Sequence, residues 1–419
     1  MTTYTILGAH CFDPIQNIDT VADIVVEDGI IAEIGSPEVR GSLIDGKGAT
    51  LFPGFVDVHV HLRDPGFPEK ETMETAALGA LKGGYTHLVA MANTSPTMDS
   101  PELIGEFYRK AEGAPVHLYT VAALTQGLAG AELSDLPACK EAGAVGFSDD
   151  GKPIAQESLF RRGLGKASGL GLPVSLHEED PAQITLAGIN DQQGKLMGLG
   201  GAPISSEVDF IRRDLEGLQE GERLDIQHIS TAEGAQLVAE AHARGHEVLG
   251  EITPHHLLLT QEAVAQYGTL AKMNPPLRRE EDCEALIQFL RREPFVVATD
   301  HAPHTQEEKE LPFPEAPSGI IGLETAFPLL YTHLVLKGKI SLEELIAAMT
   351  HRPAAFYQLP YGGLAVGAEA SFTLVDLERE ETIRRDYFHS KSSNSPFVDW
   401  TVRGKILGTF AKGKYHPMV

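Results

Sequence analysis

Two histidines flank a single valine in the segment 57–66, DVHVHLRDPG, and an arginine follows two residues later. Alternate residues of a strand point to the same side, about 6.5 Å apart at a rise of ~3.3 Å per residue. If this segment ends a strand, His59 and His61 can bind one metal ion, and Arg63 leans toward the same place. The Arg63 guanidinium can bind a carboxylate through two N–H groups. The alternative for Arg63 is a surface ion pair with Asp64.

Polar residues also end four further apolar runs, AVGFSDD, LPVSLHEE, LDIQHIS and FVVATDHAPH. The candidate metal ligands are His59, His61, Asp150, His177, His228 and Asp300. All are imidazoles or carboxylates, a set that suits zinc, with cobalt or manganese as substitutes. Six ligands exceed one tetrahedral site. We therefore expect two metal ions that share one carboxylate and a water or hydroxide.

Some neighbouring residues compete for these roles. Asp149 is the alternative to Asp150 as the shared carboxylate. The pairs His255 with His256, and Glu178 with Glu179, also follow apolar runs. We interpret His255 and His256 as packing groups or as groups that support a ligand. Glu178 and Glu179 are either solvated or placed beside the ligands, where one of them could orient a ligand ring.

The elements that must position these residues form a repeat of strand and helix. Eight apolar runs are the predicted strands, at 54–62, 86–94, 116–124, 144–150, 172–179, 224–230, 247–256 and 295–304. Helical patterns lie between or after them, as at 71–84 and 341–352. Eight such units predict an α/β fold of the (β/α)8 TIM-barrel type, whose active site lies at the carboxyl ends of the strands.

Both ends of the chain differ from this repeat. They consist of short β-branched runs separated by glycine-containing turns, which predicts a small β-sandwich domain made by the two termini. The expected division is 1–51 and 357–419 for the β-sandwich and 52–356 for the barrel. Segment 305–319 is acidic and rich in proline, so we expect a loop over the barrel mouth without regular helix; the alternative is an ordinary solvated loop.

The bulk composition restricts the partners. The 419 residues carry a formal net charge of −25, which disfavours binding to nucleic acid or to an anionic membrane. An anionic substrate must therefore be held by local positive charge. Three widely spaced cysteines indicate a reducing compartment, and the N-terminus has no secretory pattern, so we expect a cytoplasmic protein.

The motifs DVHVHLRDPG and TDHAPH resemble those of the amidohydrolase superfamily and, within it, the dihydroorotase family of the larger bacterial type. MANTSPTMD, GFSDDG, SLHEED, QHISTAEG, MNPPLR and SGIIGLETAFPLL follow in the order typical of that family. The resemblance covers nearly the whole chain. It departs from the family pattern at Ala92, where proline is common, and at Asp64, where glutamate is usual.

The resemblance implies a role for each candidate ligand. His59, His61 and Asp300 would bind the more buried of two zinc ions, His177 and His228 would bind the other, and Asp150 would bridge them. Many relatives use a carboxylated lysine as the bridge. The only nearby lysine here is Lys152, beyond the end of the predicted strand.

The resemblance also implies a substrate and a reaction. Arg63, Asn93 and His304 would hold a carboxylate, and Asn274 with the backbone of Ser318 and Gly319 would contact a pyrimidine ring. The reaction is the reversible closure of N-carbamoyl-L-aspartate to L-dihydroorotate in pyrimidine biosynthesis. A metal-bridging hydroxide attacks the ring amide, with Asp300 as general acid and base.

Two rival functions stay open. An allantoinase or hydantoinase would use the same metals on another cyclic amide, but allantoinases resemble this motif with asparagine at the position of Arg63. A non-catalytic scaffold for aspartate transcarbamoylase would typically lack metal ligands, which are all present here. We expect a homodimer, and a complex with that transcarbamoylase is compatible with an active enzyme.

Overall fold

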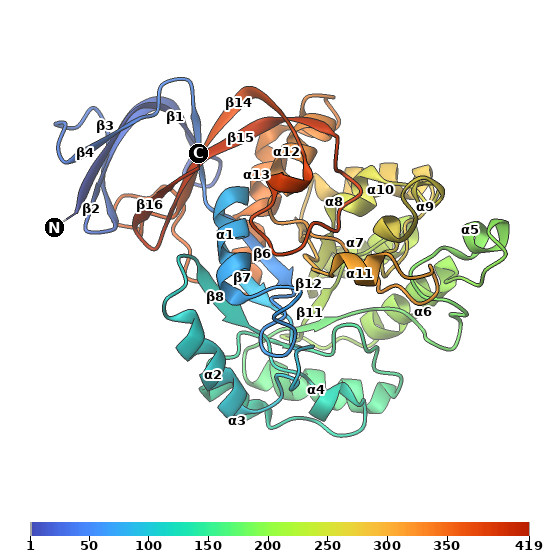
Figure 1. The fold of residues 1–419 in the computed structure, drawn as a ribbon. Coiled ribbons are helices and arrows are strands. Elements are labelled where there is room, and N and C mark those ends of the chain that lie inside the picture. Colours follow the sequence, from blue (N-terminus) through green and yellow to red (C-terminus); the bar gives the residue numbers. More distant parts are fainter. Residues whose placement is uncertain (1, 419) are drawn as a thin grey trace.

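A barrel of parallel strands forms the centre of the computed structural model, which describes residues 2–418 (Figure 1). Its eight strands within these residues are β6 (Phe55–Val60), β7 (Tyr85–Ala90), β8 (His117–Thr120), β9 (Phe147–Ser148), β10 (Val174–Leu176), β11 (Arg223–Ile226), β12 (Glu247–Ile252) and β13 (Phe295–Val297). Parallel bridges from Ala122 to Phe147 and from Val60 to His301 join the three-stranded and five-stranded sheets. The barrel therefore closes, which confirms the predicted fold class.

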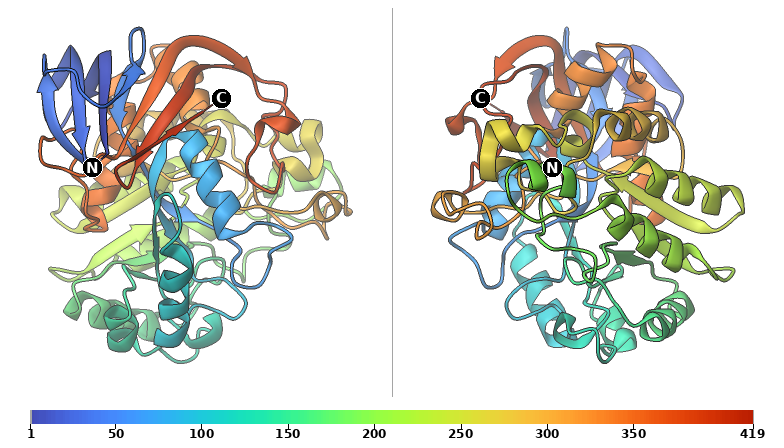
Figure 2. Two further views of the ribbon diagram at one scale, coloured as in Figure 1. Left: turned by 60° about the vertical axis from the view of Figure 1, so that its left-hand side comes forward. Right: turned by 90° about the vertical axis from the view of Figure 1, so that its right-hand side faces the viewer.

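Helices and short turns of helix surround the barrel (Figure 2). Within residues 2–418 the α-helices are α1 (Met73–Gly83), α2 (Pro101–Ala111), α3 (Leu136–Glu141), α4 (Glu157–Gly169), α5 (Asp191–Leu196), α6 (Ile204–Leu215), α7 (Ala232–Ala243), α8 (Pro254–Leu258), α9 (Ala263–Tyr267), α10 (Glu280–Leu290), α11 (Gln306–Lys309), α12 (Ala326–Leu330), α13 (Leu342–Met349) and α14 (His351–Phe356). The shorter helical segments are η1 (Gln126–Leu128), η2 (Gly268–Ala271), η3 (Tyr331–Val335) and η4 (Arg385–Tyr387). Among the same residues, no helix has both the length and the apolar composition required to cross a bilayer.

Local sequence explains where two predicted helices begin and end. The helix expected at 71–84 is α1, which starts at the N-cap Thr72 and stops at Gly84, whose φ of 82° lies in the left-handed region. The helix expected at 341–352 is divided into α13 and α14. Thr350 between them has the non-helical angles φ −129° and ψ −94°, and Pro353 is tolerated because it falls in the first turn of α14.

The two ends of the chain form one β domain beside the barrel. Its strands are β1 (Thr3–Asp13), β2 (Ile18–Glu27), β3 (Ile30–Gly35), β4 (Ser42–Asp45), β5 (Thr50–Pro53), β14 (Phe372–Thr382), β15 (Thr401–Ala411) and β16 (Lys414–Pro417). They are connected in the order β16-β15-β14-β5-β1-β2-β3, with β4 paired to β1. The antiparallel pair of β5 and β14 joins the N-terminal strands to the C-terminal ones, and the blue N-terminal strands lie beside the red C-terminal strands (Figures 1 and 2). A separate core that includes Ile6, Leu51, Phe372 and Phe410 lies within this domain.

The segment after β13 is mainly loop, as the sequence predicts, but it contains one turn of helix. Residues Gln306–Lys309 form the single turn α11. Thr305 and Glu308 form a capping box at its start, in which each side chain accepts a hydrogen bond from the backbone of the other residue. The local capping pair therefore outweighs the acidic and proline-rich composition of the rest of the segment.

Aromatic rings connect the β domain to the barrel. The ring centroid of Phe52 in β5 lies 5.7 Å from that of Phe327 in α12. Phe55 at the start of β6 stacks on the same Phe327 ring, with 5.1 Å between the centroids. Phe55 also contacts Tyr85 of β7 at 5.7 Å. These side chains are buried, so they fix the direction in which β6 enters the barrel.

Replacement of Phe55 by alanine should lower the free energy of unfolding by about 3–5 kcal/mol, because it opens a cavity at this joint. Urea denaturation would measure the change. Val21→Ala is the control, since Val21 is 68% exposed and its truncation should cost less than about 0.5 kcal/mol. Equal effects from the two substitutions would contradict this role of Phe55.

Candidate active site

The carboxyl ends of the barrel strands surround a cavity of about 230 Å³. It is lined by His61, Arg63, Asn93, Asp150, Gly151, His177, His228, Asn274, Asp300, Ala302, His304, Ser318 and Gly319. The structure thus brings together all the candidate site residues except His59, which is fully buried and contacts Asp150 and Asp300. This cavity lies where barrel enzymes place their chemistry.

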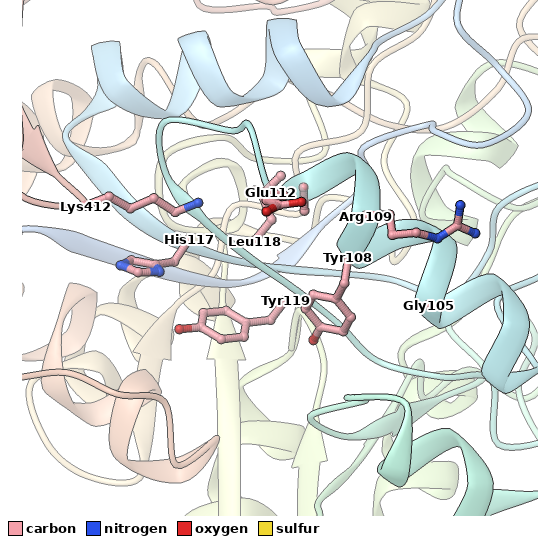
Figure 3. Close-up of a pocket in the computed structure, with 9 residues that line it drawn as sticks. Gly105, Tyr108, Arg109, Glu112, His117, Leu118, Tyr119 and Lys412 are labelled. Carbon is pink, nitrogen blue, oxygen red and sulfur yellow. The ribbon is translucent and has the colours of Figure 1, made fainter.

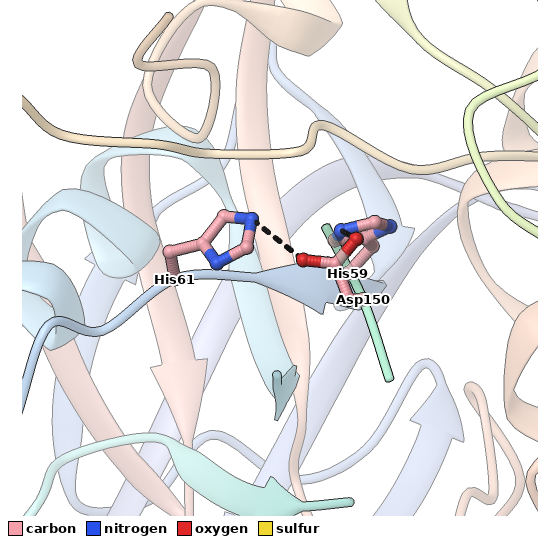
Figure 4. Close-up of side chains that lie close together, drawn as sticks. All are labelled: His59, His61 and Asp150. Atoms are coloured by element: carbon pink, nitrogen blue, oxygen red, sulfur yellow. Dashed lines mark ion pairs between the residues drawn. The ribbon is translucent and has the colours of Figure 1, made fainter. Parts of the chain in front are cut away.

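Asp150 belongs to two groups of potential metal ligands. In the first group, its Oδ1 lies 3.6 Å from His59 Nε2 and its Oδ2 lies 3.6 Å from His61 Nε2 (Figure 4). In the second group, its Oδ1 lies 3.7 Å from His228 Nε2 and 3.9 Å from His177 Nδ1. One carboxylate between two pairs of imidazoles is the arrangement that a bridging ligand requires.

Asp300 adds a second carboxylate to the first group. Its Oδ1 lies 2.9 Å from His61 Nε2 and 3.6 Å from His59 Nε2. Asp300, His228 and Arg63 have φ angles of 47°, 34° and 58°, in the left-handed region that residues with a side chain rarely adopt. Such backbone angles persist where the surrounding structure holds them, commonly at functional sites.

The contacts of His59 test whether this group suits a cation. Its Nδ1 lies 2.7 Å from Glu251 Oε2, so Nδ1 carries a proton and donates it to that carboxylate. Its Nε2 is buried without a hydrogen-bond partner and faces Asp150 and Asp300. A lone pair directed at two carboxylates is repulsive unless a proton or a metal ion lies between them. The residues therefore fit a divalent cation.

The pKa shifts agree with this charge pattern. Burial alone would lower the pKa of His59, but Glu251 and Asp150 raise it well above the ordinary value. Burial alone would raise the pKa of Asp150, but His59 and the other imidazoles lower it strongly. The pKa of Asp300 is lowered in the same way, against burial, by His61 and His59. All three shifts favour a cluster of carboxylates that remain ionised beside positive charge.

Asp149 and Asp150 point to different surroundings. Asp149 Oδ1 accepts a hydrogen bond of 2.9 Å from the Thr125 backbone N–H, and Oδ2 accepts one from the Thr125 hydroxyl. Burial raises the pKa of Asp149 to about 6. The structure therefore brings Asp150, and not Asp149, among the four histidines.

The other side of the cavity carries hydrogen-bonding groups for a ligand. Arg63 Nε donates to Pro303 O at 3.1 Å, and Arg63 Nη2 lies 3.3 Å from His304 Nε2. His304 Nε2 lies 2.9 Å from Ser318 O. The pKa of His304 is lowered to about 2 by burial and by the Arg63 charge, so the ring is neutral.

Two asparagines link this side to the ligand cluster. Asn93 Oδ1 lies 2.9 Å from His61 Nδ1, and its Nδ2 donates to Asp150 Oδ2 at 2.8 Å. Asn274 Nδ2 lies 3.3 Å from His177 Nε2. Each asparagine therefore contacts the cluster of candidate metal ligands and also lines the cavity.

The alternative ion pair between Arg63 and Asp64 is wrong. The Asp64 carboxylate accepts a hydrogen bond of 2.6 Å from Lys110 Nζ. Within residues 2–418, Arg63 forms no ion pair with a carboxylate. Its charge is thus available to an anion in the cavity.

Sequence reasoning missed Glu251. This residue is buried in β12, and its Oε2 is bonded both to His59 Nδ1 and, at 3.2 Å, to the His228 backbone N–H. The available signal is an acidic residue inside the otherwise apolar run VLGEI. Glu179 makes a similar contact, with its Oε2 3.0 Å from His177 Nε2.

The remaining competing residues lie outside the cavity. His256 is buried between Thr253, at 2.9 Å from its Nδ1, and Pro275 O, at 3.0 Å from its Nε2. His255 packs against His256 at 4.6 Å between ring centroids. Glu178 is buried, and burial raises its pKa well above the ordinary value.

A larger cavity of about 480 Å³ lies elsewhere, between α2, β8 and the turn before β16 (Figure 3). Its lining includes Tyr108, His117, Tyr119 and Lys412. His117 begins β8 and pairs with Glu369 at 2.6 Å. The cavity is thus at the amino-terminal end of a barrel strand, where this fold does not place catalytic groups.

Comparison with known proteins agrees with this geometry. Residues 48–234 match the family model Dihydro-orotase-like, and residues 215–415 match the model Amidohydrolase family. The chain is 39% identical to a dihydroorotase of Clostridium acetobutylicum, with 98% of each protein covered. It is 42% identical to a dihydroorotase of Carboxydothermus hydrogenoformans, with 93% of this chain and 92% of the relative covered. An L-hydantoinase from Arthrobacter aurescens superposes with a TM-score of 0.89 at 26% identity, over 100% of this chain and 98% of that one.

The fold and the ligand cluster define a metal-dependent amidohydrolase built on a (β/α)8 barrel with a β-sandwich domain. Within this class, the chain belongs to the dihydroorotase family.

Substitution of the two neighbouring aspartates should separate their roles. Asp150→Asn should weaken metal binding more than about a hundredfold, because a shared ligand contributes more than the 10–100-fold typical of a residue that hydrogen-bonds a ligand. Asp149→Asn should retain the metal, since its carboxylate binds Thr125 instead. Metal titration followed by elemental analysis would measure both. Retention of metal by Asp150→Asn would contradict the bridging assignment.

Glu251→Gln should weaken metal affinity about 10–100-fold, because it removes the negative charge that fixes the His59 ring. Glu247→Gln is the matched control, since Glu247 lies on the same strand with an exposed side chain paired to Arg223. Competition with a fluorescent chelator would measure the affinities. If the two variants had the same affinity, Glu251 would have no role in holding the metal.

Proposed function

We propose that this chain catalyses the reversible interconversion of L-dihydroorotate and N-carbamoyl-L-aspartate in pyrimidine biosynthesis. The observation that carries the proposal is Arg63, which has no carboxylate partner within residues 2–418 and lies in the same cavity as the histidine and aspartate cluster. A carboxylated cyclic amide needs both features. The names of the relatives support the same reaction.

The metal ions of this proposal are two zinc ions per subunit. His59, His61 and Asp300 would hold one, His177 and His228 would hold the other, and Asp150 would bridge them. Bound zinc would polarise the amide carbonyl and lower the pKa of a water molecule toward neutrality.

The protein's own residues then orient the substrate and move a proton. Arg63, Asn93 and His304 bind the carboxylate, while Asn274 and the backbone of Ser318 and Gly319 hold the ring. During hydrolysis the ring C–N bond breaks. A carboxylate oxygen of Asp300 accepts the proton of the attacking water and donates it to the leaving ring nitrogen. Ring closure follows the reverse path.

A hydantoinase is the second candidate function, because the L-hydantoinase from Arthrobacter aurescens has a closely similar fold. The fold of this chain and its cluster of candidate metal ligands would serve either activity. Arg63 favours the carboxylated substrate, since its guanidinium lines the cavity, has no carboxylate partner within residues 2–418 and would be stabilised by a bound anion. A non-catalytic scaffold is disfavoured, because such a protein needs no converging ligands.

We further propose a cytoplasmic homodimer able to associate with aspartate transcarbamoylase. The three cysteines, Cys11, Cys139 and Cys283, are buried and unpaired, which supports a reducing compartment. The net charge of −25 argues against nucleic-acid partners.

We also propose that the chain is divided into a barrel domain, residues 52–356, and a β-sandwich domain made of residues 1–51 and 357–419. Limited proteolysis would test these boundaries.

Arg63→Met should reduce kcat/KM for dihydroorotate more than about a hundredfold, since a charge-assisted bidentate pair contributes several kcal/mol to a bound carboxylate. The bound metal should be unchanged. Arg109→Met is the control, because the Arg109 side chain is 74% exposed. A spectrophotometric assay of ring opening would measure both variants. Unchanged turnover by Arg63→Met would remove the dihydroorotase assignment, and faster hydantoin hydrolysis would favour the second candidate.

A further inference from the structure

A loop of the β domain reaches the mouth of the barrel. Residues 383–400 join β14 to β15 and extend from the β domain over the barrel (Figure 1). Asn394 in this loop is only 4% exposed. Its Oδ1 accepts a hydrogen bond of 3.1 Å from the His304 backbone N–H. Its Nδ2 donates to Ala302 O at 3.0 Å and to Gly319 O at 3.2 Å.

The loop is held firmly on both sides of Asn394. Before it, the buried carboxylate of Glu71 accepts hydrogen bonds from the Lys391 backbone N–H at 3.1 Å and from the Ser390 hydroxyl. After it, Phe397 is buried in an apolar cluster that contains Ile320. The position of Asn394 is therefore set by contacts that do not involve the cavity.

The two segments joined by Asn394 carry different parts of the proposed substrate site. Segment 302–304 includes His304 and Pro303 O, which accepts the Arg63 Nε–H at 3.1 Å. The other segment includes Gly319, one of the backbone groups proposed to contact the ring. A Cβ atom on Gly319 would lie 2.8 Å from Ala302 Cβ, so the segments approach closely here. The amide of Asn394 spans this approach.

We propose that Asn394 is a positioning residue that fixes the carboxylate-binding groups, Arg63 and His304, relative to the ring-binding backbone at Ser318 and Gly319. This inference rests on the proposed function. In this role a loop of the β domain contributes to substrate binding. Asn394 itself is neither a candidate metal ligand nor part of the cavity lining. The role predicts a loss of substrate binding with the chemical step largely intact.

Two variants and a matched control test the role. Asn394→Ala removes all three side-chain hydrogen bonds. Asn394→Asp keeps the size and the acceptor for the His304 N–H but directs a carboxylate oxygen at two carbonyl oxygens. Ser395→Ala is the control, because the buried Ser395 hydroxyl accepts a hydrogen bond from the Phe397 backbone N–H of the same loop and forms no hydrogen bond with a group of the cavity among residues 2–418.

Steady-state kinetics of dihydroorotate hydrolysis at pH 8, with metal content and thermal unfolding measured on the same samples, give the readout. Both Asn394 variants should raise KM at least about tenfold and change kcat less than about threefold, as expected when binding common to ground and transition states is lost. Ser395→Ala should stay within about twofold of the wild type in both parameters.

The outcomes separate the two proposals. An active wild type whose Asn394 variants keep its KM would overturn the positioning role alone. Equal losses in 1/KM and kcat, loss of metal, or unfolding of both variants would also overturn it, because they indicate a general structural role. A wild type without dihydroorotate hydrolysis would overturn the proposed function and this inference with it.

Discussion

Asp150 and Asp300 carry their negative charges at a place from which water is largely excluded, and the rest of the site compensates those charges. A buried carboxylate is costly unless hydrogen bonds and opposite charge surround it. Four imidazoles supply most of this compensation, and Asn93 donates a further hydrogen bond to Asp150. The compensation is incomplete at His59, whose unpartnered Nε2 faces both acids. The same residues that tolerate the charges are therefore the residues that suit a cation.

The barrel makes this concentration of charge possible because its strands end together. The buried Asp57 contributes to the alignment, since its Oδ1 accepts hydrogen bonds from the His59 N–H at 3.1 Å and from the Thr299 N–H at 3.2 Å. It thus ties the first ligand-bearing strand to the segment that carries Asp300. Glu251 has a parallel role between His59 and the His228 backbone. Asp57 and Glu251 thus hold His59 and the segments around His228 and Asp300 from outside the cavity lining.

The sequence was sufficient to predict the barrel and the convergence of six candidate ligand side chains, because polar residues at the ends of apolar runs must meet at one edge of a parallel sheet. Other features depend on tertiary contacts. Asp149 and Asp150 both follow β9, and only the contact with Thr125 distinguishes them. Asn394 is 90 residues from His304 and lies in the loop between β14 and β15, so no local pattern indicates their contact. The short helix α11 shows that a local capping pair can outweigh composition.

Anomalous X-ray diffraction from zinc-loaded crystals, recorded on both sides of the zinc absorption edge, would test directly whether Asp150 lies between two metal ions. If Asp150 bridges two zinc ions, two peaks should lie on either side of its carboxylate, with His59 and His61 at one and His177 and His228 at the other. An absence of peaks among these side chains, or peaks bound to other residues, would contradict it.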